Sequence, residues 1–262
     1  MKTFNLFLAG LLSALAGCAS LPGTQVSDNG EGRIEYAQSG SGRPAVVFET
    51  GFGSDMDSWR TVLEETSRFT TTFAYNRPGY GGSDATERTR DPQTVVEELR
   101  RLLRERGLDA PYVLVGHSLG GLYMQYFARR YPEEVAGLVL VDATHPRQLD
   151  FIRDKAPDDY KILRFMTSLF AGTLRREFDD SVRAGAQIEA LAPMVGKPVV
   201  ILTATKPNAF ESQKFAEVKA EMQRDLARQF PGSRQVLVAS GHFIQREAPA
   251  DVVAAIRSVS GK

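Results

Sequence analysis

Short apolar runs alternate with helix-patterned stretches along most of the chain, and this alternation limits the fold more than any other feature. Continuous apolar runs are typical of parallel strands that are covered on both faces. Strands that alternate with helices predict an α/β fold with a mostly parallel, doubly wound sheet. The expected strands are Ile34–Ala37, Ala45–Glu49, Thr70–Tyr75, Tyr112–Val115, Gly137–Val141, Pro198–Thr203 and Arg234–Ala239.

The expected helices carry start and stop signals. Asp91 before Pro92 combines an N-cap aspartate with a proline at the first helical position, and Gly107 can end that helix. A second helix is expected over Leu119–Arg130, directly after a strand. Two more are expected around the apolar sets Phe215, Val218, Met222 and Leu226, and Val252, Val253 and Ile256.

Two stretches break the alternation. Residues from about 145 to 196 have helical apolar patterns and no good strand. We interpret them as a helical cap inserted into one α/β domain of residues 33–262, rather than as a second domain. Residues 18–32 are rich in Gly, Ser, Asn and Asp and predict a tether or loop.

The N-terminal residues are typical of an export signal. Lys2 supplies a positive charge, and residues 4–16 are apolar apart from one Asn and one Ser. These thirteen residues are too few to cross a hydrocarbon core about 30 Å thick, but they fit the apolar stretch of a signal peptide. The alternative is a plain signal peptide with an incidental cysteine.

The sequence Leu15-Ala16-Gly17-Cys18 resembles the lipobox of bacterial lipoproteins. The resemblance implies that residues 1–17 are a lipoprotein signal peptide and that Cys18 is acylated, with palmitate among the attached chains. It also implies a membrane partner through lipidated Cys18. Ala19 rather than aspartate follows the cysteine, which in such lipoproteins favours the outer membrane of the bacterial cell envelope, facing the periplasm.

Composition excludes several classes of function. Lys+Arg and Asp+Glu both number 32, so the formal net charge is zero and no nucleic-acid partner is expected. The single cysteine excludes an intrachain disulfide. The chain has only three histidines, so a multi-histidine zinc site would need nearly all of them. We expect neither a metal nor an organic cofactor.

The strongest chemical signal is a serine between a strand and a helix. Residues 112–121 combine a buried strand, a Gly-x-Ser-x-Gly motif around Ser118 and the start of a helix. A nucleophile on a sharp turn has strained backbone angles, and glycines beside it avoid clashes. The helix also directs its dipole and free N–H groups at negative charge forming there. This context predicts a nucleophile, whereas an ordinary serine in a glycine-rich turn is the alternative.

With these features the chain resembles the α/β-hydrolase family over roughly residues 34–258. Residues 46–53 resemble the strand and the His-Gly turn that supply half of the oxyanion hole, with Thr50 in place of the histidine. The resemblance implies the backbone N–H groups of Phe52 and Leu119 as the oxyanion donors.

A second turn of the family is also recognisable. Residues 76–83 resemble its Asp-Arg-x-Gly-x-Gly-x-Ser turn, with Asn76 in place of aspartate. We interpret this turn as structural.

A serine hydroxyl needs a base, because it is a poor nucleophile at neutral pH. His242 lies directly after the last expected strand, where the histidine of this fold comes in chain order. We interpret His117, inside the serine motif, as a packing residue. His145 remains open between a residue that lines the site and one that begins the cap.

The acid partner of the histidine is less clear. The family's usual position is the turn after Pro198–Thr203, which has no carboxylate before Glu211. Asp142 ends the preceding strand, where some members place their acid. A carboxylate at either strand end could orient His242. We favour Asp142, while Glu211 and a water-assisted dyad remain alternatives.

Acyl transfer to water is the most direct reaction for such a set. The dehalogenases and epoxide hydrolases of the family use aspartate as nucleophile, so a serine argues against both. We therefore expect a serine hydrolase that cleaves small-molecule carboxylic esters, as an esterase, a lactonase or a lipase.

Two other functions remain open. One is a proline-type aminopeptidase, which would need cap carboxylates to hold a substrate ammonium group; the available ones are Asp158, Asp159, Glu177, Asp179 and Asp180. The other is a catalytically inactive, lipid-anchored binding protein, against which the intact serine, histidine and glycines argue.

Overall fold

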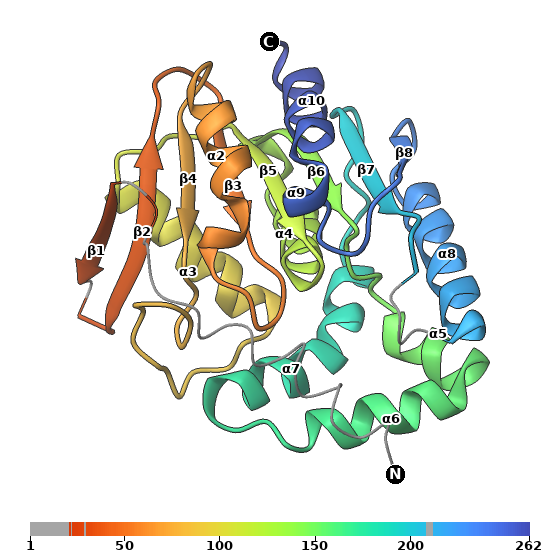
Figure 1. The fold of residues 1–262 in the computed structure, drawn as a ribbon. Helices are drawn as coiled ribbons and strands as arrows, with labels where there is room; N and C mark the ends of the chain where they lie inside the picture. The colour runs from red at the N-terminus through yellow and green to blue at the C-terminus, as the bar shows by residue number, and fades with distance from the viewer. Residues whose placement is uncertain (1–20, 22, 29, 208–211) are drawn as a thin grey trace.

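The computed structural model describes residues 21, 23–28, 30–207 and 212–262. Within these residues, an eight-stranded sheet forms the centre of the molecule (Figure 1). The spatial order is β1-β2-β4-β3-β5-β6-β7-β8. The strands β3 to β8 pair in parallel, and β1 and β2 pair antiparallel at one edge. The strands are β1 (Thr24–Asp28), β2 (Arg33–Ser39), β3 (Ala45–Glu49), β4 (Thr72–Tyr75), β5 (Tyr112–His117), β6 (Val135–Val141), β7 (Val199–Ala204) and β8 (Arg234–Val238). The predicted doubly wound α/β sheet is confirmed.

Helices cover both faces of this sheet. In Figure 1, α2, α9 and α10 lie in front of it, and α3 and α4 lie behind it. All residues of β3 and β5 are buried, which explains their continuous apolar sequences. The helices are α2 (Arg60–Ser67), α3 (Pro92–Glu105), α4 (Leu119–Arg130), α5 (Gln148–Lys155), α6 (Pro157–Thr167), α7 (Gly172–Glu189), α8 (Gln213–Arg228), α9 (Ile244–Glu247) and α10 (Pro249–Ser260), with short 3-10 turns η2 (Met56–Trp59) and η3 (Pro132–Glu134).

Local sequence signals set the helix boundaries. The side chain of Asp91 accepts a hydrogen bond from the Thr94 N–H, and Pro92 occupies the first turn of α3. This cap satisfies one of the N–H groups that a helix start leaves free. At the other end, Gly107 adopts a left-handed φ of 70° just beyond the helix.

Three helices, α5, α6 and α7, lie between β6 and β7 in the chain. They extend across the carboxyl ends of the central strands (Figure 1). Ile152 and Ala156 of the cap form a small apolar cluster with Val218 and Met222 of α8. The cap is therefore packed against α8, the helix that follows β7.

One prediction for the N-terminal part is wrong. Residues 24–28 form the edge strand β1, whereas the sequence predicted a tether or loop over residues 18–32. Backbone pairing with β2 holds this strand, from Thr24 opposite Ala37 to Asp28 opposite Arg33. Only Ser27 of β1 is buried, so the strand has no apolar pattern that could have revealed it.

Cys18, the signal-like segment and Glu211 lie outside the described residues. Within the part that the structure describes, no helix combines the length and apolar character needed to cross a bilayer.

Candidate active site

Ser118 occupies a strained turn between β5 and α4. Its backbone has φ 52° and ψ −122°, and the only other described non-glycine residue with a positive φ is Asp142. The flanking glycines are required by close approach. A Cβ on Gly116 would lie 2.6 Å from the Gly120 carbonyl oxygen, and one on Gly120 would lie 2.4 Å from the Thr50 carbonyl oxygen. Only glycine fits at either position.

A chain of hydrogen bonds joins Ser118, His242 and Asp142. His242 Nε2 is 3.0 Å from Ser118 Oγ, and His242 Nδ1 is 2.6 Å from Asp142 Oδ2. An ionised carboxylate only accepts hydrogen bonds, so Nδ1 carries the proton and donates to Asp142. Nε2 is then free to accept from the serine hydroxyl, which is the arrangement in which an imidazole can remove the hydroxyl proton.

The carboxylate of Asp142 is buried and fully engaged. Oδ1 accepts the Ala204 N–H at 3.1 Å, and Oδ2 accepts from His242 and from Lys219 Nζ, the latter at 2.8 Å. Burial alone would raise the pKa of Asp142. The hydrogen bond and charge of His242, followed by those of Lys219, outweigh burial and hold the pKa below its usual value.

The sequence analysis missed Lys219. A signal was present, because Lys219 lies four residues after Phe215 and three before Met222, on the expected apolar face of its helix. A charged residue on such a face must find a partner when it is buried. That partner, Asp142, directly follows the strand β6 and could not be read from the sequence of the helix alone.

His117 and His145 both have structural contacts. His117 Nε2 lies 2.9 Å from the backbone oxygen of His242, and the two rings are 4.6 Å apart. Burial, followed by the charge of His242, holds the pKa of His117 well below its usual value, so the ring is neutral and donates to that oxygen. His117 thus supports the loop of His242, as expected for a packing residue.

His145 lines the pocket and also anchors the start of the cap. Its Nε2 is 2.8 Å from Asp225 Oδ2 on α8, and its Nδ1 accepts the Arg147 N–H at 3.0 Å. Burial lowers the pKa of His145, while the hydrogen bond to Asp225 opposes that effect. Both ring nitrogens have hydrogen-bond partners. His145 therefore does both things that the sequence left open: it lines the pocket and it begins the cap.

The turn after β3 lies beside Ser118. Phe52 and Leu119 both line the pocket, and neither backbone N–H has an acceptor among the described residues. The Thr50 hydroxyl, which replaces the family's histidine, donates to the Ser54 carbonyl oxygen at 3.1 Å. The Thr50 side chain therefore shapes the turn rather than facing the serine.

A buried arginine holds this turn from behind. Arg77 donates from Nη1 to the Thr50 carbonyl oxygen at 2.8 Å and from Nη2 to the Gly51 carbonyl oxygen at 3.1 Å. It also pairs with Glu49 at 2.6 Å and with Glu177 of the cap helix α7 at 2.7 Å, all with no exposed side-chain surface. The turn that resembles the family motif at residues 76–83 is therefore structural, and it connects the cap to the turn after β3.

Asn76, which replaces the family's aspartate in that motif, is also structural. Its Oδ1 accepts the Met56 N–H at 2.8 Å, and its Nδ2 donates to Glu35 at 2.5 Å. The amide thus joins β2, β4 and η2, a task for which it supplies both a donor and an acceptor.

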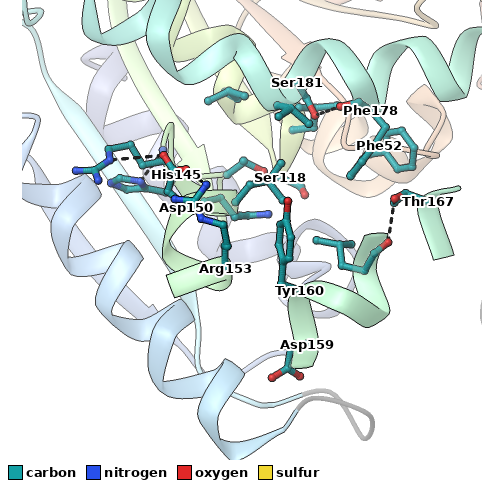
Figure 2. Close-up of a pocket in the computed structure, with 18 of the residues that line it drawn as sticks. Phe52, Ser118, His145, Asp150, Arg153, Asp159, Tyr160, Thr167, Phe178 and Ser181 are labelled. Carbon is teal, nitrogen blue, oxygen red and sulfur yellow. Dashed lines mark hydrogen bonds and ion pairs between the residues drawn. The ribbon is translucent and has the colours of Figure 1, made fainter. Parts of the chain in front are cut away.

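Ser118 opens into a cavity of about 860 Å³ under the cap (Figure 2). In this view Tyr160 extends from α6 toward Ser118. Phe52 forms part of one wall, with ring centroids 5.3 Å from Phe170 and 6.2 Å from Phe178. Most of the lining side chains are apolar, among them Phe52, Leu119, Leu122, Leu149, Tyr160, Ile162, Leu163, Met166, Phe170, Phe178, Val182 and Phe215.

The cap carboxylates do not form an ammonium site. Of the five that the sequence offered, Asp159 alone lines the pocket, and it accepts a hydrogen bond from Ser212 at 2.9 Å. Glu177 is paired with Arg77, and Asp179 with Arg175. Asp158 pairs with Lys161, and Asp180 with Arg183. No group of three or more His, Cys, Asp or Glu side chains that could hold a metal ion occurs within the described ranges.

Known proteins are similar in sequence to part of this chain. "Uncharacterized protein YbdG" of Bacillus subtilis is 30% identical over 145 residues, 55% of this chain and 44% of its own length. "Epoxide hydrolase 3" of Xenopus tropicalis is 37% identical over 117 residues, 44% of this chain and 32% of its own length. The chain thus spans less than half the length of these relatives.

A solved structure extends the likeness to the whole fold. The enol-lactonase of Burkholderia xenovorans superposes with a TM-score of 0.68 at 16% identity, over 91% of this chain and 100% of the other. The family model described as "Alpha/beta hydrolase family" matches residues 46–256. This match, together with the strained serine turn and the order of the strands, shows that the chain belongs to the alpha/beta hydrolase family.

Proposed function

We propose that this protein is a serine hydrolase that cleaves carboxylic esters with Ser118, His242 and Asp142 as its catalytic triad. The observation that carries the proposal is the hydrogen-bonded chain of these three side chains, with Ser118 on a strained turn that opens into the cavity. Strain at such a position persists where the surrounding structure enforces it, and it is concentrated at functional sites.

The reaction follows from the geometry. Ser118 Oγ attacks the ester carbonyl carbon while His242 Nε2 takes the hydroxyl proton. The N–H groups of Phe52 and Leu119 stabilise the negative oxygen of the tetrahedral intermediate, and one such donor is typically worth about 3 kcal/mol. The alcohol leaves with the proton from His242, and a water molecule activated by His242 then releases the acid from Ser118.

The cavity favours esters with a sizeable apolar group. Its lining is dominated by aromatic and aliphatic side chains, and apolar substrate surface is stabilised when it leaves water. No observation favours the aminopeptidase, because four of its five candidate carboxylates lie away from the pocket and pair with cations.

We also propose that Cys18 is lipidated and holds the protein at a bacterial membrane. The support is the lipobox-like Leu15-Ala16-Gly17-Cys18 after an apolar stretch. Several acyl chains on one residue anchor a protein far more firmly than one chain does.

Hydrolysis of a p-nitrophenyl ester series tests the enzymatic proposal. We expect wild-type turnover to rise from acetate to longer acyl chains, and Ser118→Ala to lower it at least about a thousandfold, because triad members act as a unit. Ser181→Ala, which removes another hydroxyl that lines the pocket, serves as the matched control and should retain most activity. Near wild-type turnover by Ser118→Ala would refute the mechanism, and preferential cleavage of prolyl anilides would favour the peptidase.

A further inference from the structure

A lysine reaches the carboxylate that holds His242. Lys219 lies on α8, and its Nζ is 2.8 Å from Asp142 Oδ2. The same oxygen accepts His242 Nδ1–H at 2.6 Å. The Lys219 side chain is 17% exposed and that of Asp142 is 0% exposed, so solvent screens this pair little. An ammonium and an imidazole therefore share one carboxylate oxygen.

The other charged or titratable groups around His242 come from β5 and α9. His117 of β5 lies against the His242 ring and is kept neutral by burial. Arg246 of α9 acts on His117 through its charge, and its guanidinium lies 5.2 Å from the ring centroid of Phe243. Glu247 of the same helix accepts the Gly241 N–H at 2.8 Å, next to His242. Within the described residues, Lys219 is the one lysine or arginine in direct contact with Asp142.

The helix that carries Lys219 is fixed by contacts of its own. Val218 and Met222, its neighbours on α8, pack against Ile152 and Ala156 of the cap. Gln223 of the same helix donates from Nε2 to the Ala143 carbonyl oxygen at 2.8 Å, next to Asp142. The packing of α8 therefore fixes the part of the helix from which the Lys219 side chain reaches Asp142.

A fixed positive charge near an imidazole disfavours the protonated ring, since two like charges then lie close together. The same charge favours ionised Asp142, which orients the ring through Nδ1. The first effect favours a neutral His242, and the second keeps the tautomer whose Nε2 is free to accept the serine proton.

We propose that Lys219 is a positioning residue that keeps His242 in its neutral, base-competent form at lower pH by holding a positive charge against Asp142. The kinetic consequence rests on the proposed function, in which His242 is the base. The consequence for the titration of the His242 ring does not.

A merely structural role for Lys219 predicts a different result. If the lysine only balanced the buried charge of Asp142, its removal would lower stability or activity to a similar extent at every pH. The pH dependence therefore separates the two roles.

The kinetic experiment compares Lys219→Met, Lys219→Arg and the control Lys214→Met, whose side chain on the same helix is 60% exposed. The rate kcat/KM for a p-nitrophenyl ester is measured from pH 5 to 9 at constant ionic strength. We expect the acid limb of Lys219→Met to move to higher pH by about half a unit or more. Lys219→Arg and Lys214→Met should keep the wild-type limb. An unmoved acid limb in Lys219→Met would overturn the proposal, whatever the plateau rate.

An NMR titration of the imidazole rings gives a readout without turnover. With three histidines in the chain, the signals of His242 are assigned by their loss in His242→Gln. We expect the titration midpoint of this ring to move to higher pH in Lys219→Met, and an unmoved midpoint would contradict the inference. Lys219→Gln, which keeps a donor to Asp142 without the charge, replaces the Met variant if that variant does not fold. A moved midpoint in a protein that cleaves no ester would refute the proposed function and leave the role of Lys219 intact.

Discussion

Ser118 and Asp142 share a backbone property as well as a chain of hydrogen bonds. Both have a positive φ, at 52° and 41°, although neither is a glycine. Such a conformation costs roughly 1–3 kcal/mol for each residue and persists only where neighbours enforce it. The Ser118 N–H donates to the Val141 carbonyl oxygen at 3.1 Å, and the Asp142 N–H donates to Leu202 at 2.8 Å. The two strained positions therefore support each other across the ends of β5, β6 and β7.

Replacing the carboxylate of Asp142 tests its role at this scale. We expect Asp142→Asn to fold and to lower ester turnover by about 10²–10³-fold, because an amide no longer holds the His242 tautomer that frees Nε2. Glu211→Gln should change turnover little. The measurement is kcat/KM of both variants, with their melting temperatures compared with that of the wild type. If Glu211→Gln strongly lowered kcat/KM and Asp142→Asn left it nearly unchanged, the acid would be Glu211, after the strand that the family normally uses.

At the scale of elements, Arg77 joins three parts of the molecule. It connects β3 through Glu49, the turn beside Ser118 through two carbonyl oxygens, and the cap helix α7 through Glu177. Tyr75 donates a hydrogen bond to Glu49 at 2.5 Å, and Tyr80 donates one to Glu177. Burial raises the pKa of Glu49, and the charge of Arg77 opposes that effect. One cation thus keeps two buried carboxylates paired.

Removing that cation should destabilise the fold strongly. Arg77→Met leaves Glu49 and Glu177 buried without their partner, and we expect a loss of about 3–5 kcal/mol in the free energy of unfolding. Arg68→Met removes an arginine whose pair with Glu65 is exposed, and it should change the free energy little. Urea unfolding monitored by circular dichroism measures both. Equal losses in the two variants would contradict the role given to Arg77.

The burial of His145 between the start of the cap and α8 should make the free energy of unfolding depend on pH. The folded pKa of His145 lies below the usual 6.5, so the unfolded chain binds the proton first as the pH falls. The free energy of unfolding should therefore decrease from pH 7.5 to pH 5. His117 adds a change of the same sign. The pKa of Asp225 is lowered to about 2, so its contribution is lost only at lower pH.

Urea unfolding of His145→Gln at the two pH values checks this expectation. The decrease between pH 7.5 and pH 5 should be smaller in the variant than in the wild type, because one of the two neutral buried histidines is gone. An equal decrease in the free energy of unfolding for the two proteins would show that His145 does not titrate as its burial implies.

At the scale of the whole molecule, the proposal that Cys18 is lipidated predicts that the protein is held at a membrane. We expect Cys18→Ala to shift the protein out of the membrane fraction of bacterial cells, because the acyl chains can no longer be attached. Fractionation and immunoblotting of both forms measure the shift, and a soluble periplasmic marker controls the separation. Equal recovery of wild type and variant in the membrane fraction would refute the anchor.

Local sequence was sufficient for most of the fold. The strand, turn and helix around Ser118 were predictable because consecutive residues determine them, from the apolar run of β5 to the glycines that alone fit the turn. The start of α3 was predictable for the same reason, since Asp91 and Pro92 act on the first turn that they touch. The strand β1 was not, because pairing with β2 rather than its own residues makes it a strand.

The environment of the candidate site depended on contacts between distant residues. The sequence left Asp142, Glu211 and a dyad as alternatives, and only folding brings Asp142 to within 2.6 Å of His242, a hundred positions away. The contacts of Lys219 with Asp142 and of Arg77 with Glu177 likewise join separate elements. Apart from β1, the sequence by itself determined the order of strands and helices and the nucleophile turn, because these follow from short-range sterics and periodic burial. The tertiary structure decided which charges meet behind His242 and behind the turn after β3, because ion pairing depends on distance in space and not on distance along the chain.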